Sequence, residues 1–350
     1  MPSRRIAIVL FNLGGPDRPA AVKPFLFNLF NDRNIIDLPN PFRWALAKLI
    51  AHRRGPVATH VYDQIGGGSP ILPNTQAQAT ALEAALPDIG EVKTFIAMRY
   101  WHPFTEDTVR AVKDWAPDEI VLLPLYPQFS TTTTASSLRV WETTARKIGL
   151  KARQHALCCY PDEPGFVTAL SEITRQAIGR AEAEVPGKVP AIIFSAHGLP
   201  QKIVDKGDPY VAQVETTVGA AVKQLALDPA QWVIAYQSRV GPLKWVGPST
   251  DEMITVYAKE GRPIVIVPVA FVSEHSETLV ELDIEYRHLA TSNGAAAFVR
   301  APTVATHPAF IEGLARLSRQ ALAQNGPLQP GCSGAACRGQ SQCAMTQAGA

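Results

Sequence analysis

Ile264-Val-Ile-Val-Pro-Val269 is an apolar, β-branched run, and Ile120-Val-Leu-Leu-Pro-Leu125 repeats its pattern earlier in the chain. Runs of this kind are typical of buried strands in parallel sheets. Both lead into a segment rich in Ser, Thr or Glu. The shared Ile-Val-x-x-Pro pattern indicates an internal duplication, and chance similarity between apolar strands is the alternative.

Short apolar runs alternate with longer segments that are compatible with helices. Strands are expected at 6–11, 92–98, 119–123, 155–159, 191–194, 232–236, 264–269 and 296–299, the fourth on the weakest pattern. This alternation predicts an α/β protein with parallel sheets and right-handed crossovers. We expect two doubly wound halves, 1–160 and 161–325, followed by a cysteine-containing extension, 326–350.

Composition limits the class of protein. The chain has 350 residues, 46% hydrophobic and 18% charged, with a net charge of +2, so it can bury a large core and has no global field for nucleic acid. The longest apolar run, 264–272, contains Pro268 and falls far short of the roughly 20 residues that span a bilayer. Since the N-terminus shows no signal-peptide pattern, we expect a cytoplasmic protein.

Glycine-rich turns follow the first strand of each half, as Leu13-Gly-Gly-Pro16 and His197-Gly-Leu-Pro200. Ligands of doubly wound sheets bind at the carboxyl ends of the strands, so we expect a cleft between the halves there. No G-x-G-x-x-G or Walker pattern is present, which argues against a nucleotide. Gly66-Gly-Gly68 is either a loop close to a ligand or to another backbone segment, or a surface turn.

His197 lies directly after a predicted buried strand, at the expected edge of the cleft. A lone histidine is more often structural, unless a partner faces it. The partner expected here is an acidic segment after the matching strand, in which Glu277, Glu281 and Glu285 are spaced i, i+4, i+8. Like charges at this spacing repel each other on a helix. A metal cation or a proton path would explain the row, and nearby arginines such as Arg287 would explain it structurally.

Imidazole and carboxylate ligands suit Fe(II), Zn(II) or Co(II), and two of them make an open site that a metal can pass through. The other turns after strands, near residues 99–102, 126–134 and 237–245, are aromatic and polar rather than phosphate-binding. They indicate a large, flat, apolar substrate with anionic edges.

Six strings spread along the chain resemble signatures of the ferrochelatase family. They are Asp63-Gln-Ile-Gly-Gly-Gly-Ser-Pro-Ile71, Met98-Arg-Tyr100 with His102-Pro103, Leu125-Tyr-Pro-Gln128, Phe194-Ser-Ala-His-Gly-Leu-Pro200, Gln237-Ser-Arg-Val-Gly-Pro242 and Glu281-Leu-Asp-Ile-Glu-Tyr286. The resemblance implies a chelatase fold of two Rossmann-like halves, each with a four-stranded parallel sheet. It also implies a lyase that inserts Fe(II) into protoporphyrin IX, the terminal step of haem biosynthesis, without a nucleotide.

The resemblance assigns roles to residues of both halves. It makes His197 the proton acceptor and Glu277 an iron ligand or a proton relay. In the alternative interpretation both residues are iron ligands. His275 is a further candidate ligand, and Glu281 and Glu285 form an acidic relay. The expected porphyrin-binding residues are Leu13, Arg54, Tyr62, Ser69, Arg99, Tyr100, Trp245 and Phe271, and Arg54 could pair with a propionate.

Two other functions stay open from the sequence. A related chelatase acting on coproporphyrin III would need more cations at the pocket rim, and a non-catalytic haem or porphyrin carrier would not need the His197–Glu277 pair. Monomer and homodimer are both compatible with the sequence. Contact with a membrane surface through 25–30 is an option, but a buried amphipathic helix there is favoured.

The cysteines are too few for a disulfide scaffold. Some ferrochelatases hold a [2Fe–2S] cluster with one internal and three C-terminal cysteines, and the resemblance implies this set here: Cys158, Cys332, Cys337 and Cys343. Their C-x4-C-x5-C spacing departs from the animal pattern, and Cys159 competes with Cys158 for the internal position. A zinc site or a thiol-bearing flexible tail is the alternative.

Overall fold

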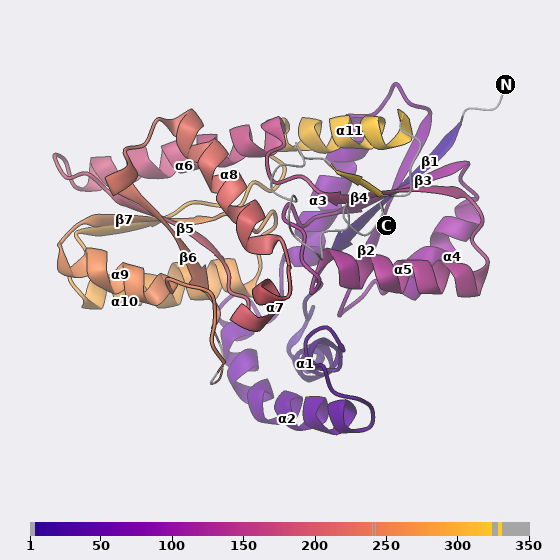
Figure 1. Cartoon of the computed structure of the whole chain (residues 1–350), viewed down its shortest axis with the longest axis horizontal. Coiled ribbons are helices and arrows are strands. Elements are labelled where there is room, and N and C mark those ends of the chain that lie inside the picture. The colour runs from indigo at the N-terminus through magenta and orange to yellow at the C-terminus, as the bar shows by residue number, and fades with distance from the viewer. Residues whose placement is uncertain (1–3, 240, 242, 324–327, 331–350) are drawn as a thin grey trace. The chain divides into compact units, whose positions relative to one another are not determined.

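The computed structural model describes residues 4–239, 241, 243–323 and 328–330. The chain divides into two compact units (Figure 1). The first unit contains the described residues up to Cys159 together with those of Leu314–Gln329, and the second contains Tyr160–Gly313 and Pro330. Helix α11 (Pro308–Ala323) therefore has residues in both units. The expected limits 1–160, 161–325 and 326–350 stay a prediction, since most of the last range lies outside the described residues.

The first unit is built on a sheet with the strand order β2-β1-β3-β4-β9. The strands are β1 (Arg5–Asn12), β2 (Glu91–Met98), β3 (Glu119–Pro124), β4 (Arg153–Cys159) and β9 (Leu328–Pro330). The helices lying wholly in this unit are η1 (Pro19–Ala21), α1 (Val22–Phe30), α2 (Phe42–Asp63), α3 (Ile71–Ala84), α4 (Thr105–Trp115) and α5 (Thr134–Ile148). The first four strands pair in parallel as predicted, and β9 is a fifth strand that the sequence pattern did not indicate.

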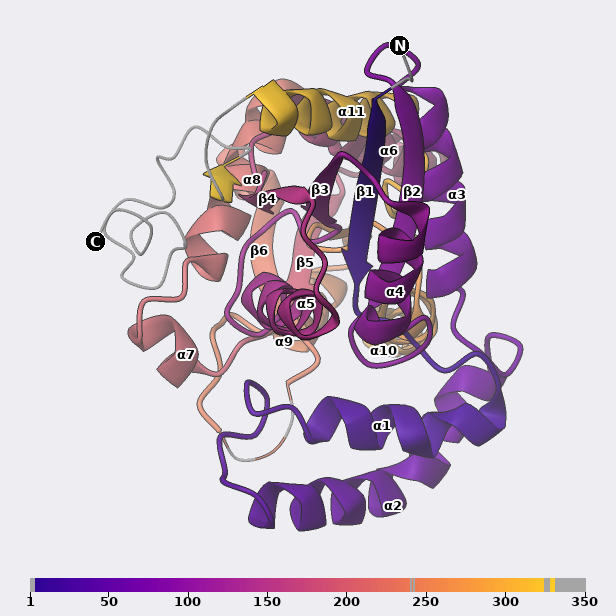
Figure 2. The ribbon, with the colours of Figure 1, turned by 90° about the vertical axis from the view of Figure 1, so that its right-hand side faces the viewer.

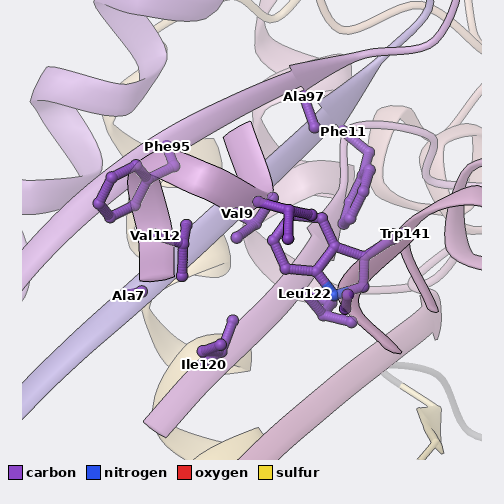
Figure 3. Close-up of a cluster of buried hydrophobic side chains, with 11 residues drawn as sticks. Ala7, Val9, Phe11, Phe95, Ala97, Val112, Ile120, Leu122 and Trp141 are labelled. Carbon is purple, nitrogen blue, oxygen red and sulfur yellow. The ribbon is translucent and has the colours of Figure 1, made fainter. Parts of the chain in front are cut away.

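The core of the first unit follows from the alternation of side chains along its strands. Ala7, Val9 and Phe11 of β1 point to one face, where Val112 of α4 and Trp141 of α5 cover them (Figure 3). The Trp141 ring meets Phe11 edge-on, with centroids 5.6 Å apart. Both faces of β1 are buried, which holds its carboxyl end rigidly in place.

A pair of helices extends from the first unit. Figure 2 shows α1 and α2 side by side. Phe25 and Leu26 of α1 are buried in a cluster that includes Tyr62 and Tyr100, and 27–30 are partly buried, which favours the buried reading of 25–30. Among the described residues no helix is long and apolar enough to cross a bilayer.

The second unit is built on a four-stranded sheet with the order β6-β5-β7-β8. The strands are β5 (Ala191–His197), β6 (Trp232–Gln237), β7 (Pro263–Pro268) and β8 (Ala297–Arg300), all parallel. The helices lying wholly in this unit are α6 (Pro164–Glu184), α7 (Gln201–Asp205), α8 (Tyr210–Leu225), η2 (Pro229–Gln231), α9 (Thr250–Lys259), a π-helix η3 (Glu277–Glu285) and α10 (Tyr286–Ser292).

Helices cover both faces of the second sheet. On one face Ile193 and Ile264 pack against Ile254 of α9, Leu282 of η3 and Tyr286 of α10. On the other face α6 packs against β7 and β8, and α8 packs against α6. Local sequence fixes helix starts here: Ser249 and Glu252 form a reciprocal cap at α9.

The two sheets have the same strand order when strands are counted within each unit, second-first-third-fourth. Phe11 pairs with Pro124 in one sheet, and Ser195 pairs with Pro268 in the other. The proline that ends the repeated Ile-Val-x-x-Pro pattern thus has the same place in both sheets. This shared topology supports duplication over chance similarity, and it makes Leu13 the positional equivalent of His197.

The glycine turns of the first unit pack against each other. The Ser69 amide donates to the Pro16 carbonyl at 2.7 Å. A Cβ on Gly68 would lie 2.7 Å from the Asp17 carbonyl oxygen, and one on Gly15 would lie 2.5 Å from the Ser69 Cβ. Of the two readings of Gly66-Gly-Gly68, the close approach to another backbone segment is therefore the one observed.

Candidate active site

His197 ends β5 and stands at the carboxyl edge of the second sheet. Gly198 follows, and its amide donates to the Gln237 carbonyl at 2.9 Å. A Cβ at this position would lie 2.8 Å from that carbonyl oxygen, so the close approach requires glycine. The strand and its glycine therefore fix where the imidazole leaves the sheet.

The imidazole meets the carboxylate that the sequence analysis placed opposite it. His197 Nδ1 lies 2.9 Å from Glu277 Oε2, and the two side chains are 40% and 30% exposed. Glu277 is the first residue of η3, which follows β7. The pair is accessible from solvent, as a site for a passing metal or proton must be.

Ser238 connects Glu277 to the next carboxylate, Glu281. Its hydroxyl donates to Glu281 at 2.5 Å and lies 3.5 Å from Glu277, and its amide also donates to Glu281 at 2.8 Å. Ser238 has a φ of 60°, the left-handed region, which aims both groups at the same carboxylate. Gln237 and Tyr286 add donors to Glu281, at 3.1 and 3.2 Å.

The surroundings of His197, Glu277 and Glu281 shift the pKa values of these three groups in different directions. Burial opposes charge on His197, but the Glu277 carboxylate outweighs it and raises the pKa of the imidazole. Burial would also raise the pKa of Glu277, yet the charge and the hydrogen bond of His197 hold that pKa well below its usual range. The pKa of Glu281 is raised, first by burial and then by the Glu277 charge. The site thus pairs an ionised carboxylate with a carboxyl group that accepts a proton more readily.

His275 is oriented away from a simple ligand role. Its side chain is buried, and its ring packs on Phe271 with centroids 4.7 Å apart. Nδ1 accepts the Thr278 amide at 3.3 Å, so the proton of the neutral ring is on Nε2. Burial lowers the pKa of His275, which keeps the ring neutral.

The three glutamates of the acidic row differ in their surroundings. Glu277 and Glu281 both contact Ser238, whereas Glu285 ends η3 and is exposed. Arg287 ion-pairs with Asp283 at 2.6 Å, and the structure shows no contact between it and the row. In the described part of the chain no group of three His, Cys, Asp or Glu side chains is arranged to hold a metal ion.

The expected porphyrin-binding residues of the second unit are partly exposed. Trp245 is bridged to Pro200, and among the described residues its indole N–H has no hydrogen-bond partner. Its ring edge would lie 3.4 Å from a Cβ on Gly198, so this ring lies close to the residue after His197. The ring of Phe271 packs against the ring of His275.

In the first unit, Arg99 and Tyr100 both turn to Asp32. The Arg99 guanidinium and the Tyr100 hydroxyl each donate to Asp32 Oδ2 at 2.7 Å, and the Ser136 hydroxyl donates to it at 2.8 Å. Burial would raise the pKa of Asp32, but the Arg99 charge and these donors lower it. Arg99 and Tyr100 are therefore held by an ionised, buried carboxylate.

The other expected residues of the first unit have varied surroundings. Tyr62 is buried, Leu13 packs against the same cluster, and Ser69 is half-buried in the glycine turn. Arg54 is exposed on α2, with its guanidinium 5.8 Å from the Phe30 ring. Of these four residues, Arg54 is the charged one, and its exposure leaves its guanidinium open to an anionic ligand.

The sequence analysis gave no role to Ser238, Asp32 or Tyr286. Ser238 and Tyr286 lie within two of the family strings, so a motif-by-motif reading could have found them. Asp32 follows α1 on a loop and belongs to no such string, and its partners are 67 to 104 positions away. Only the fold brings it to Arg99.

Of the four expected cluster ligands, Cys158 alone lies in the described part of the chain; Cys332, Cys337 and Cys343 lie outside it. Cys158 and Cys159 end β4, both are buried, and their Sγ atoms are 3.0 Å apart. The expected cluster therefore stays a prediction.

Comparison with known proteins gives consistent matches over the chain. A family model described as Ferrochelatase matches residues 5–322. Curated relatives named Ferrochelatase include one from Caulobacter vibrioides, 50% identical over 96% of this chain and 94% of its own, and one from Phenylobacterium zucineum, 51% identical over 92% and 93%. One from Pelagibacter ubique is 47% identical over 89% and 90%. Among solved structures, SirB from Bacillus subtilis with Fe3+ is similar in fold, with a TM-score of 0.52 at 11% identity, covering 91% of this chain and 96% of its own.

Proposed function

We propose, because the chain belongs to the ferrochelatase family and is an enzyme of that family, that it inserts Fe(II) into protoporphyrin IX to give protohaem. The observation that carries the proposal is the His197–Glu277 pair, 2.9 Å apart and partly exposed at the carboxyl edge of the second sheet. It offers a base and an anionic metal ligand side by side.

The reaction requires the removal of two pyrrole protons as the metal binds the four nitrogens. His197 accepts one, since the neighbouring Glu277 carboxylate stabilises the resulting imidazolium. Glu277 stays ionised and serves as a ligand for the incoming Fe(II), which is a substrate and not a resident metal. Glu281, whose pKa is raised, accepts a proton through Ser238 and passes it towards solvent, with Glu285 as the exposed end of the relay.

His275 supports this site as a neutral positioning group in our proposal. Its Nδ1 is engaged by the Thr278 amide, so direct binding of iron would need Nε2 to lose its proton. Iron binding by His197 together with Glu277 remains the second arrangement, and it uses the same two side chains.

The porphyrin is proposed to contact Leu13, Arg54, Tyr62, Ser69, Arg99, Tyr100, Trp245 and Phe271. Supporting this, Arg54 is exposed and positively charged, as a propionate partner must be, and Trp245 and Phe271 are partly exposed aromatic rings. Arg99 and Tyr100 contribute their apolar parts, because Asp32 already engages their polar groups.

The test of the proposal is metal insertion by the full chain, followed by the loss of porphyrin fluorescence and the shift of the visible absorption bands. Fe(II) under anaerobic conditions and Zn(II) are the two metals, and His197→Ala and Glu277→Ala are the variants. A well-folded but inactive wild-type protein would exclude the enzyme. Full activity of His197→Ala would exclude His197 as the required base, and porphyrin binding by a well-folded wild-type protein that inserts no metal would favour the carrier.

Protoporphyrin IX and coproporphyrin III are separated by relative kcat/KM. The second substrate carries two more propionates, which need additional cations at the pocket rim. Preference for coproporphyrin III would replace the substrate in our proposal but leave the roles of His197 and Glu277 unchanged.

A [2Fe–2S] cluster held by Cys158, Cys332, Cys337 and Cys343 is our proposal for the C-terminal cysteines. Two observations fit it: Cys158 is buried beside Cys159 at the end of β4, and β9, which neighbours β4, ends two positions before Cys332. The cluster would supply structural support or redox sensing. Anaerobically purified protein should show visible charge-transfer absorption and two irons per chain. Zinc in place of iron would indicate a four-cysteine zinc site, and neither metal would indicate a metal-free tail.

Contact with an anionic membrane surface is proposed for α2. Phe42, Trp44, Leu49 and Val57 are exposed, and the helix carries four Lys or Arg residues and one Asp. A surface of this kind binds vesicles by apolar burial and by attraction to anionic lipids. Sedimentation of the protein with phosphatidylglycerol vesicles would support this membrane contact if the double variant Phe42→Ser/Trp44→Ser no longer sediments with them. The cytoplasmic location stays a proposal with it.

A further inference from the structure

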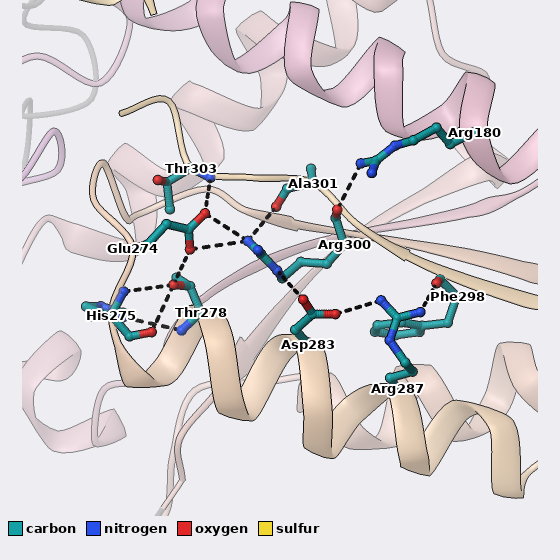
Figure 4. Close-up of polar contacts among 10 residues, drawn as sticks. All are labelled: Arg180, Glu274, His275, Thr278, Asp283, Arg287, Phe298, Arg300, Ala301 and Thr303. Carbon is teal, nitrogen blue, oxygen red and sulfur yellow. Dashed lines mark hydrogen bonds and ion pairs between the residues drawn. The ribbon is translucent and has the colours of Figure 1, made fainter. Parts of the chain in front are cut away.

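One arginine contacts both ends of the segment that carries Glu277. Arg300 ends β8, and its Nη1 lies 3.0 Å and 3.2 Å from the two carboxylate oxygens of Glu274 (Figure 4). Its Nε lies 3.3 Å from Asp283 Oδ2. Glu274 precedes η3 by three residues, and Asp283 lies in its last turn, so the guanidinium joins the two ends of the π-helix.

The π-helix needs such support. It is a rare conformation that occurs mostly as short segments at functional sites. The side chain of Ser276, at the cap position of η3, does not cap its amides. Instead Glu274 receives the Thr303 amide at 3.0 Å and the Thr278 hydroxyl, and Arg300 supplies the balancing charge.

A chain of hydrogen bonds leads from Arg300 to His275. The Thr278 hydroxyl that donates to Glu274 also accepts the His275 amide at 3.0 Å. The Thr278 amide donates to the ring of the same histidine. Arg300 itself is 12% exposed, and it touches neither His197 nor Glu277 in the part of the chain that is described.

We propose that Arg300 is a positioning residue for metal insertion: by joining Glu274 to Asp283 it holds η3 in its wide turn, with Glu277 at His197 and His275 at Phe271. The inference rests on the proposed function, because it gives this segment the role of presenting the metal ligand. It extends that function to a residue that reaches neither the metal nor the porphyrin.

The surroundings of Arg300 supply matched controls. An open pocket of about 720 Å³ has Arg180, Asp283, Arg287 and Arg300 among its lining residues. Arg180 donates to the Arg300 carbonyl at 3.0 Å, but it is not seen to touch Glu274 or Asp283. Arg180→Ala therefore removes an arginine from the same pocket without breaking the connection between the two carboxylates.

The experiment compares Arg300→Ala, Arg300→Lys and Arg180→Ala in the full chain, with Zn(II) and protoporphyrin IX as substrates. Loss of a residue that orients a metal ligand typically lowers metal-dependent activity 10–100-fold. We expect Arg300→Ala to lower kcat/KM for the metal by about this factor with the porphyrin KM unchanged. Arg300→Lys should retain more activity, guanidinium ions added to Arg300→Ala should restore part of it through the pocket, and Arg180→Ala should stay within about twofold.

Amide hydrogen exchange provides the readout that does not depend on activity. In Arg300→Ala, peptides covering 273–286 should exchange faster, while peptides of β5 keep their protection. If Arg300→Ala does not fold, Glu274→Gln removes the same ion pair with little change of shape and must give the same exchange pattern.

Unchanged exchange in 273–286, or a loss of activity no larger than that of Arg180→Ala, would overturn the inference. So would an equal rise of both the metal and the porphyrin KM, which indicates general loosening. A wild-type protein that inserts no metal would end the proposed function, yet the exchange data would still show whether Arg300 holds η3. The two failures are therefore distinguishable.

Discussion

At the carboxyl end of the second strand of each unit, two consecutive residues donate hydrogen bonds to one carboxylate, but the pKa of that carboxylate is shifted in opposite directions in the two units. In the first unit Arg99 and Tyr100 donate to Asp32, and in the second Gln237 and Ser238 donate to Glu281. The strand registers make these pairs equivalent, since Ala97 pairs with Phe11 and Ala235 with Ser195. Each unit thus places a carboxylate in front of two consecutive donors.

The difference lies in one residue. Arg99 places a cation beside Asp32, which lowers the pKa of that carboxyl, whereas the neutral Gln237 leaves Glu281 beside Glu277, whose charge adds to burial in raising its pKa. A carboxylate whose pKa is lowered suits a structural anchor. A carboxylate with a raised pKa suits proton transfer, so one scaffold supports anchoring in the first unit and chemistry in the second.

The largest expected effect separates the equivalent positions Leu13 and His197. His197→Ala should lower kcat for metal insertion by about 10²–10⁴-fold, because it removes the proposed base. Leu13→Ala should mainly raise the porphyrin KM, by about tenfold, because it removes apolar contact only. Steady-state insertion of Zn(II) measures both. Similar losses of kcat in the two variants would contradict the division of roles between the units.

The next effect tests the two carboxylates by stability. Asp32→Asn leaves the guanidinium of Arg99 without its buried counter-charge, and we expect a loss of about 3–5 kcal/mol in the free energy of unfolding. Glu281→Gln removes a carboxylate that forms no ion pair with Lys or Arg in the described part of the chain, so it should change stability less and metal insertion more.

Denaturant unfolding of both variants measures the comparison. Asp37→Asn is the control in the same loop as Asp32, because its side chain is 76% exposed and pairs only loosely with Arg33 at 3.4 Å. It should leave the unfolding midpoint nearly unchanged. A larger loss of stability in Glu281→Gln than in Asp32→Asn would reverse our assignment.

A smaller effect compares Gly14 with Gly198, the glycines that follow the first strand of each sheet. Gly14 has a φ of 83°, and a Cβ there would lie 3.0 Å from the Trp101 amide nitrogen. Gly14→Ala should therefore destabilise the fold by about 1–3 kcal/mol. In Gly198→Ala the new Cβ pushes against the Gln237 carbonyl, next to His197, so metal-insertion activity should fall as well as stability. Thermal melts and insertion rates, measured on both variants, test this comparison. A larger loss of activity in Gly14→Ala than in Gly198→Ala would contradict it.

The finest test is the pH dependence of the second unit. Because the folded pKa of His197 is raised, its contribution to stability is complete below its ordinary pKa and is lost as the pH rises through the raised value. The contribution of Glu277, whose pKa is lowered, is lost as the pH falls through its folded value. The ion pair is thus strongest between the two.

The imidazole pKa is measurable by NMR titration of the full chain. Glu277→Gln removes the charge that raises this pKa, so it should move downward, and the rise of kcat/KM with pH should move with it. Asp32→Asn serves as the control in the other unit and should leave the His197 titration in place. An unchanged titration in Glu277→Gln would exclude the pairing seen here.

Much of the fold and the centre of the site was predictable from the sequence. All eight expected strands are present, because buried parallel strands leave β-branched apolar runs that local composition reveals. The sequence pairs His197 with Glu277 because both follow strands that must end at the same edge of one sheet. Motif spacing and topology together were enough for that step.

The remaining features depend on contacts that no local pattern encodes. The i, i+4, i+8 spacing predicts a shared face for Glu277, Glu281 and Glu285, but it does not reveal that Ser238 contacts the first two or that Glu285 is exposed. Asp32 lies on a loop without a motif, and β9 is three residues long, too short for a strand pattern. In each case tertiary packing decides the conformation.

The edge strand β8 has a protection that follows from its arginine neighbours. Arg287 donates to the Phe298 carbonyl at 2.6 Å, and Arg180 donates to the Arg300 carbonyl at 3.0 Å. These are outward acceptors that a strand from another molecule would need in order to add to the sheet. Helices on either face of the sheet thus occupy the edge with positive charge, which disfavours edge-to-edge aggregation of the protein while it is folded.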